Sequence, residues 1–106
     1  MRIAVIIPAR FGATRFPGKP LADLGGRPLI AHVVERAKQA RGVSVVAVAT
    51  DDDRIAAAAR AAGAEAILTG EAATGTDRVA VAAKRLSPPP DLVVNLQGDE
   101  PLIEPE

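Results

Sequence analysis

The 106-residue chain carries 13 lysines and arginines against 13 aspartates and glutamates, so its formal net charge at pH 7 is zero. This balance argues against a general nucleic-acid binder or a protein attracted to anionic membranes, because both carry an excess of basic residues. No cysteine is present, which excludes disulfides and thiolate metal sites. Hydrophobic residues make up 48% and aromatic residues 2%, so Ala, Val, Leu and Ile must build the core of a single domain.

The amino terminus does not resemble a signal peptide, because its apolar run is short and ends at Pro8 without a small-residue cleavage pattern. No apolar run reaches the roughly 20 residues that a membrane-spanning helix needs. We therefore expect a soluble cytoplasmic protein that binds neither nucleic acid nor membrane. Residues 3–7 are apolar and mostly β-branched, which predicts a strand buried on both faces of a parallel sheet.

A basic loop follows this strand. Segment 8–20 holds three cations, two glycines and no acidic residue. A strand that leads into such a loop is typical of a polyphosphate site, because backbone N–H groups and side-chain cations can both reach the anion. The candidate cations are Arg10, Arg15 and Lys19, and the backbone could approach closely at Ala9 and Gly12. The spacing matches neither the P-loop nor the dinucleotide glycine pattern, and the alternative is a solvated surface loop.

The rest of the chain alternates helices and strands. We expect the segments in the order helix from about 28 to 42, strand 43–49, helix from about 51 to 63, strand 64–68, helix from about 76 to 86, and strand 92–96. This alternation predicts right-handed crossovers and a mostly parallel sheet with helices on both faces. Ligands of such sheets lie beyond the carboxyl ends of the strands, where the candidate loops begin.

Two further segments carry candidate site residues. Asp99 follows the last strand and could hold Mg²⁺ on a triphosphate, while the Gln97 amide suits the polar edge of a base. The alternative for this Gly-Asp segment is an ordinary turn. In the second segment, Thr74 and Gly75 could face a base or ribose, and Arg78 could point into the site. Helix capping near residue 76 is compatible with this interpretation.

The aspartates at 51–53 are more simply explained by helix capping than by a metal site, because carboxylates are favoured at a helix amino terminus. We therefore expect the middle one of the three helices to begin here. The chain ends soon after its fourth expected strand, whereas a doubly wound domain normally continues. We expect residues 1–106 to be the amino-terminal part of a larger domain.

Together, segments 6–21, 48–51, 74–78 and 94–101 resemble the 3-deoxy-manno-octulosonate cytidylyltransferases, or CMP-Kdo synthetases. The resemblance implies a Rossmann-like, three-layer α/β/α nucleotidyltransferase fold, truncated after about the fourth strand. Residues 1–106 would be the nucleotide-binding part of a single nucleotidyltransferase domain. The implied reaction is transfer of CMP from CTP to 3-deoxy-D-manno-octulosonate (Kdo), giving CMP-Kdo and pyrophosphate for lipopolysaccharide biosynthesis. The implied cofactor is Mg²⁺, and the full-length protein would be a homodimer.

The resemblance also implies roles for individual residues. Arg10, Arg15 and Lys19 match positions that handle the triphosphate, Gln97 a position beside cytosine, Asp99 a Mg²⁺ ligand, and Thr74, Gly75 and Arg78 a substrate-facing loop. The carboxyl-terminal part of the family supplies a further metal-binding aspartate and the sugar pocket. We therefore expect the chain alone not to turn over. The alternatives are a cytidylyltransferase for another acidic sugar, such as sialic acid, a non-catalytic nucleotide-binding domain, and an α/β domain whose loops only connect.

Overall fold

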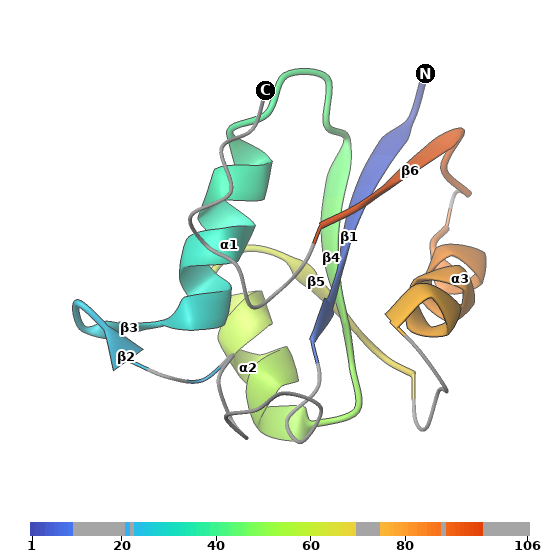
Figure 1. The fold of residues 1–106 in the computed structure, drawn as a ribbon. Coiled ribbons are helices and arrows are strands. Elements are labelled where there is room, and N and C mark those ends of the chain that lie inside the picture. Colours follow the sequence, from blue (N-terminus) through green and yellow to red (C-terminus); the bar gives the residue numbers. More distant parts are fainter. Residues whose placement is uncertain (10–20, 22, 70–74, 88, 97–106) are drawn as a thin grey trace.

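The computed structural model describes residues 1–9, 21, 23–69, 75–87 and 89–96. In these residues, four parallel strands form a sheet in the order β5-β4-β1-β6. The strands are β1 (Ile3–Ala9), β4 (Val45–Thr50), β5 (Glu65–Leu68) and β6 (Leu92–Asn95). The two long strands lie in the middle of the sheet, and the two short strands lie at its edges (Figure 1).

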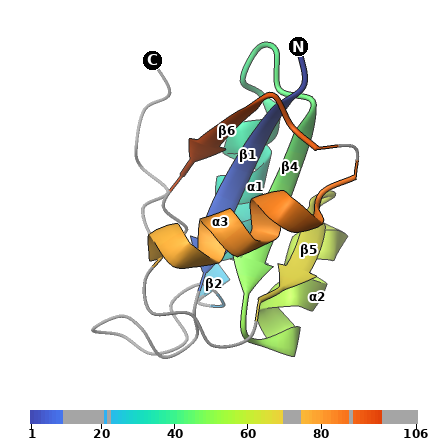
Figure 2. The ribbon, with the colours of Figure 1, turned by 90° about the vertical axis from the view of Figure 1, so that its right-hand side faces the viewer.

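Helices cover both faces of the sheet. Figure 1 shows α1 (Leu29–Lys38) and α2 (Asp53–Ala61) on one face and α3 (Gly75–Arg85) on the other. In Figure 2, α3 lies across the front of the sheet while α1 and α2 lie behind it. The predicted three-layer α/β/α fold with a parallel sheet is therefore confirmed. No helix in the described part of the chain is long and apolar enough to cross a membrane.

The alternation of side chains along β1 explains why the sheet needs helices on both faces. Val5 and Ile7 point into a core shared with α1 and α2, while Ala4 and Ile6 point into a second core shared with α3. All four are buried. A strand that is apolar at every position cannot leave either face in water, so a continuous apolar run predicts a sheet covered on both sides.

The first strand is longer than predicted. It was expected to end before Pro8, but it continues through Pro8 to Ala9. The backbone groups of even-numbered residues in β1 point toward β6, since the carbonyl of Ile6 accepts from the N–H of Leu96. The paired registers with β6 stop at Ile6 opposite Asn95. Pro8 has no N–H to donate on the side that faces β6, and it lies beyond the last registered pair with that strand.

A small hairpin precedes α1. Strands β2 (Asp23–Leu24) and β3 (Arg27–Pro28) pair antiparallel around two glycines. Gly25 and Gly26 have φ angles of 66° and 89°, which side chains disfavour and which a tight hairpin turn requires at both positions. The turn was predicted, but the two short strands were not. Pro28, expected as the first helical residue, instead lies one position before α1 with φ −63° and ψ 149°.

Asp52 caps the amino terminus of α2, as the sequence predicted for this acidic segment. Its Oδ1 accepts hydrogen bonds from the backbone N–H groups of Arg54 at 2.7 Å and Ile55 at 3.3 Å. The Arg54 side chain also donates to this carboxylate, with Nη2 2.8 Å from Oδ2. Hydrogen bonding from the Arg54 side chain, together with the backbone donors, holds the pKa of Asp52 below its ordinary value of 3.8.

Replacing this cap should destabilise the fold. We expect Asp52→Ala to lower the free energy of unfolding by about 1 kcal/mol, because two helix N–H groups lose their acceptor. The lowered pKa means that the Asp52 charge stabilises the fold above the unfolded-state value of about 3.9 and that this contribution is lost as pH falls through the lower folded-state value. Urea unfolding from about pH 3 to about pH 7 measures both effects.

Asp53→Ala is the matched control, because Asp53 lies in the first turn of the same helix but does not occupy the cap position. It should cost less stability than Asp52→Ala near neutral pH. Equal losses from the two variants at every pH would contradict the capping role of Asp52.

Candidate functional site

Three strands end close together at the carboxyl edge of the sheet. Ala9, the last residue of β1, pairs in register with Thr50 of β4, and Thr50 pairs with Leu68 of β5. The strand β6 ends at Asn95, opposite Ile6. Each segment predicted to carry the site follows one of these strand ends in the sequence: the basic segment 8–20 continues from the end of β1, 74–78 follows β5, and 97–101 follows β6. In parallel sheets this is the edge where ligands bind.

The structure places three of the predicted site residues. Ala9 is buried at the end of β1, Gly75 is the first residue of α3, and Arg78 lies in the first turns of α3. The others lie outside the described residues: Arg10, Gly12, Arg15, Lys19, Thr74, Gln97 and Asp99. Ala9 packs into the core beneath α1 and α2, so its side chain is structural and its predicted role remains one of the backbone.

Arg78 is the largest of the fully buried side chains, with 1% of its surface exposed. Its Nη1 donates a hydrogen bond to the hydroxyl of Thr69 at 2.5 Å. Its Nη2 lies 4.0 Å from Oδ2 of Asp51, whose side chain is 34% exposed. A buried guanidinium must be hydrogen-bonded or paired with an acid, because an isolated charge is strongly disfavoured away from water. That Arg78 faces a substrate stays a prediction; the structure adds the protein groups that hold it.

Thr69 connects Arg78 to the sheet. Its hydroxyl lies 3.5 Å from the carbonyl oxygen of Thr50, and its N–H donates to the same oxygen at 3.0 Å. Both threonines are buried. The hydroxyl of Thr50 in turn accepts from the N–H of Asp52 at 3.2 Å, at the turn into α2. A buried polar chain therefore runs from α3 through Thr69 to the end of β4.

Sequence reasoning missed Thr50 and Thr69. A signal was present, since each threonine stands at the carboxyl end of an apolar strand, where a buried hydroxyl must find a partner. The partner itself could not be read from the sequence. Arg78 is nine residues from Thr69, and only the fold of the intervening chain brings the two together.

The described residues contain no group of three or more His, Asp or Glu side chains that could hold a metal ion. Asp52 is used as a helix cap, and Asp51 lies near Arg78, so the acidic segment 51–53 serves the protein itself. The capping prediction is confirmed for Asp52 by its bonds to the N–H groups of Arg54 and Ile55. The predicted Mg²⁺ ligand, Asp99, lies outside the described residues.

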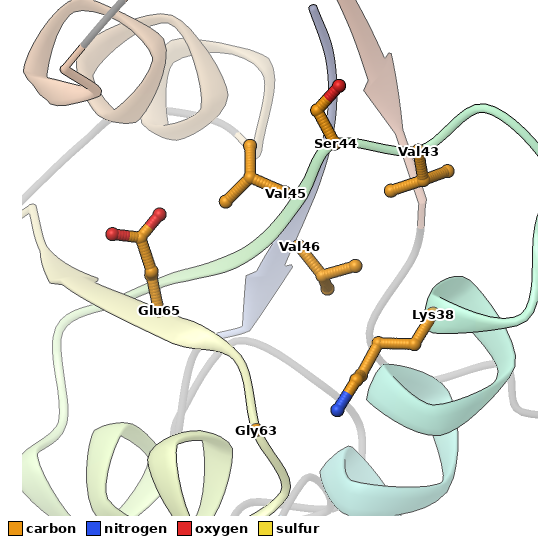
Figure 3. Close-up of a pocket in the computed structure, with 7 residues that line it drawn as sticks. All are labelled: Lys38, Val43, Ser44, Val45, Val46, Gly63 and Glu65. Carbon is orange, nitrogen blue, oxygen red and sulfur yellow. The ribbon is translucent and has the colours of Figure 1, made fainter.

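A hollow of about 290 Å³ lies away from this edge, at the amino ends of β4 and β5 (Figure 3). Its lining residues are Lys38, Val43, Ser44, Val45, Val46, Gly63 and Glu65. The Lys38 ammonium reaches toward Gly63 and lies 3.5 Å from the carbonyl oxygen of Ala62. The lysine is therefore engaged with the end of α2. Because the hollow faces the amino ends of the strands, it is not part of the candidate site.

Comparison with known proteins identifies the family of this chain. Residues 4–106 match the family model described as cytidylyltransferase. The chain belongs to this family. It is 82% identical over 104 residues to the 3-deoxy-manno-octulosonate cytidylyltransferase of Anaeromyxobacter dehalogenans (strain 2CP-C). The aligned region covers 98% of this chain and 43% of that protein. The resemblance stated from the motifs is thus confirmed over nearly the whole chain.

Two more cytidylyltransferases extend the comparison. The 8-amino-3,8-dideoxy-manno-octulosonate cytidylyltransferase of Shewanella baltica (strain OS155 / ATCC BAA-1091) is 53% identical over 107 residues, covering 99% of this chain and 44% of that protein. The solved structure of a CMP:2-keto-3-deoxy-manno-octonic acid synthetase complexed with CTP matches with a TM-score of 0.89 and 47% identity, covering 98% of this chain and 43% of that one. The cytidylyltransferase chain described here therefore spans less than half the length of these relatives.

Removing the buried cation should be costly. We expect Arg78→Ala to lower the free energy of unfolding by about 2–4 kcal/mol, because it leaves a gap in the core and takes a charged donor from the Thr69 hydroxyl. Urea unfolding measures the loss. Lys84→Ala, an exposed cation on the same helix, is the control and should change stability by less than about 0.5 kcal/mol. Similar values for the two variants would show that the Arg78 contacts do not stabilise the fold.

Proposed function

We propose that this chain is the nucleotide-binding part of an enzyme that transfers CMP from CTP to Kdo, giving CMP-Kdo and pyrophosphate for lipopolysaccharide biosynthesis. The observation that carries the proposal is the 82% identity over 104 residues to a 3-deoxy-manno-octulosonate cytidylyltransferase. The structural match to a synthetase complexed with CTP supports the choice of nucleotide. The transfer would occur by attack of the sugar's anomeric hydroxyl on the α-phosphorus.

The basic segment supplies charge for this reaction. Negative charge builds on the α-phosphate and on the leaving pyrophosphate during phosphoryl transfer, and fixed cations are the usual means of stabilising it. Arg10, Arg15 and Lys19 would do this, with the backbone at Ala9 and Gly12 close to the phosphates. The described end of β1 supports the assignment, because it delivers the chain to the carboxyl edge immediately before Arg10.

The segment after β6 would complete the nucleotide site. Because β6 pairs with β1, its end lies beside the strand that precedes the basic segment in the sequence. Gln97 would bind the cytosine edge through its amide donor and acceptor. Asp99 offers a carboxylate, the hard oxygen ligand that Mg²⁺ prefers. When bound, Mg²⁺ would neutralise charge on the triphosphate.

The amino end of α3 would face the other side of the nucleotide. Gly75 begins this helix, so backbone N–H groups in its first turn have no partner within the helix and can bind an anion or a ribose hydroxyl. We assign Thr74, Gly75 and Arg78 to this contact. For the whole protein we propose a homodimer of the cytoplasm that takes CTP and Kdo as substrates.

Kdo is favoured over related acidic sugars by the difference in similarity. Identity is 82% to the enzyme named for 3-deoxy-manno-octulosonate and 53% to the enzyme named for its 8-amino derivative. Two competing hypotheses are a cytidylyltransferase for sialic acid and a non-catalytic nucleotide-binding domain. The presence of both Lys19 and Asp99 in the sequence argues against the non-catalytic domain.

Calorimetry with CTP tests the nucleotide site. We expect Arg15→Ala and Lys19→Ala each to weaken CTP binding by about 10-fold to 100-fold, because a charge-assisted phosphate contact is worth about 1.5–3 kcal/mol. Arg41→Ala is the control, since it removes an equal charge from an exposed turn at the amino end of β4. Equal losses in all three variants would place the triphosphate elsewhere. A CTP affinity that changes neither when Mg²⁺ is left out nor in Asp99→Ala would favour a non-catalytic nucleotide sensor.

Turnover tests the reaction. We expect no pyrophosphate release from CTP and Kdo by the 106-residue chain, because it spans 43% of its relative. A chimaera in which it replaces the matching segment of the Anaeromyxobacter enzyme should release pyrophosphate from CTP and Kdo, because the carboxyl-terminal part would then supply the sugar pocket. Release by the chain alone would contradict the first expectation, and a folded chimaera that releases no pyrophosphate would overturn the assignment of this chain as the nucleotide-binding part.

A further inference from the structure

Four residues from three elements meet in a polar cluster at the carboxyl edge of the sheet. The Arg78 cluster, as we name it, consists of Thr50 at the end of β4, Asp51 after it, Thr69 after β5, and Arg78 in α3. Polar groups of this kind are seldom enclosed in a small domain, because each must be fully satisfied to offset its loss of water. The cluster lies at the edge where the nucleotide is proposed to bind.

Thr69 occupies the middle of the cluster. Its hydroxyl accepts from the guanidinium of Arg78 at 2.5 Å and is directed to the carbonyl oxygen of Thr50 at 3.5 Å. Its own N–H donates to that oxygen at 3.0 Å, which fixes its backbone to the strand. A threonine held by its backbone and bonded through its hydroxyl has little freedom to move. It therefore sets where the guanidinium lies.

Arg78 fixes the start of α3. In a helix the side chain leans toward the amino end, so Arg78 extends back over the first turn that begins at Gly75. The apolar contacts of α3 come later, from Val79, Ala82 and Leu86 on the second core. Apolar packing allows a helix to slide or tilt more readily than a directed hydrogen bond does. The bond to Thr69 thus sets the position of the first turn relative to the strand ends.

We propose that Thr69 is a positioning residue: through its hydroxyl it holds the Arg78 guanidinium and the first turn of α3 at the carboxyl edge. The nucleotide then meets an amino end of α3 that is already in place. The last step, the benefit to CTP binding, rests on the proposed function. The holding of α3 by Thr69 does not, so the two parts can be tested separately.

Three variants isolate the hydroxyl. Thr69→Val removes it while keeping the volume of the side chain, and Thr69→Ser restores it. Thr50→Val is the matched control, because it removes a buried hydroxyl from the neighbouring strand end that accepts from Asp52 rather than holding α3. All three substitutions are small, and circular dichroism would establish that each variant is folded before it is compared.

Amide hydrogen exchange on the free 106-residue chain tests the first part. We expect Thr69→Val to speed exchange of the amides at 79–81 roughly 10-fold relative to those of β1, because a hydrogen bond to a charged group restrains that turn. Thr69→Ser and Thr50→Val should leave the ratio near its original value. Unchanged exchange in Thr69→Val, or equal acceleration in Thr50→Val, would overturn the proposal.

Calorimetry with CTP tests the second part. We expect Thr69→Val to weaken CTP binding about 5-fold to 20-fold, because binding to this variant must also order the first turn of α3. Thr69→Ser should restore the affinity, and Thr50→Val should leave it within about twofold. If Thr69→Val loses stability but binds CTP normally, Thr69 is structural only and the positioning role is wrong. If the original chain does not bind CTP at all, the proposed function fails, while the exchange result still decides whether Thr69 holds α3.

Discussion

The fold depends on the parallel pairing of β1 with β4. Six registered pairs, from Ala4 with Val45 to Ala9 with Thr50, join these two central strands. This pairing places the other strands of the main sheet and the helices: β5 and β6 add on either side, α1 and α2 pack on one face, and α3 packs on the other. Because both strands run in the same direction, their ends and the segments that follow them meet at one edge. A site can therefore assemble from segments far apart in the sequence.

The parts of the fold that follow from a local pattern could be predicted. The apolar runs around Ile6 and Val48 and the helical spacing in α1 placed the main strands and helices in the right order. Pro8 misled the prediction because its cost depends on which neighbouring strand its backbone faces, and that strand, β6, lies far along the chain. The hairpin around Gly25 was predicted only as a turn, since two-residue strands carry no periodicity.

In the candidate site, the contacts of the side chains were harder to predict than their positions in the sequence. Charge and motif predicted the segments, and the described strands that precede them end at one edge, but the groups that hold Arg78 come from tertiary structure. A sequence shows that an arginine is present near the start of a helix; it does not show that the guanidinium is enclosed against Thr69 rather than exposed. Local patterns therefore cannot separate an arginine that the fold encloses from one that faces a ligand.

The lengths of the edge strands affect how readily the sheet can pair with another strand. Within the described residues, β5 and β6 are the edges of the sheet, and each has only four residues. On β6, Leu92 and Val94 leave 48% and 43% of their surface exposed on the same side of the strand. Short edges give an approaching strand few backbone groups to pair with, which protects against aggregation. The two exposed apolar side chains of β6, against Leu68 alone on β5, oppose that protection. An added strand at β6 would therefore gain buried apolar surface as well as hydrogen bonds.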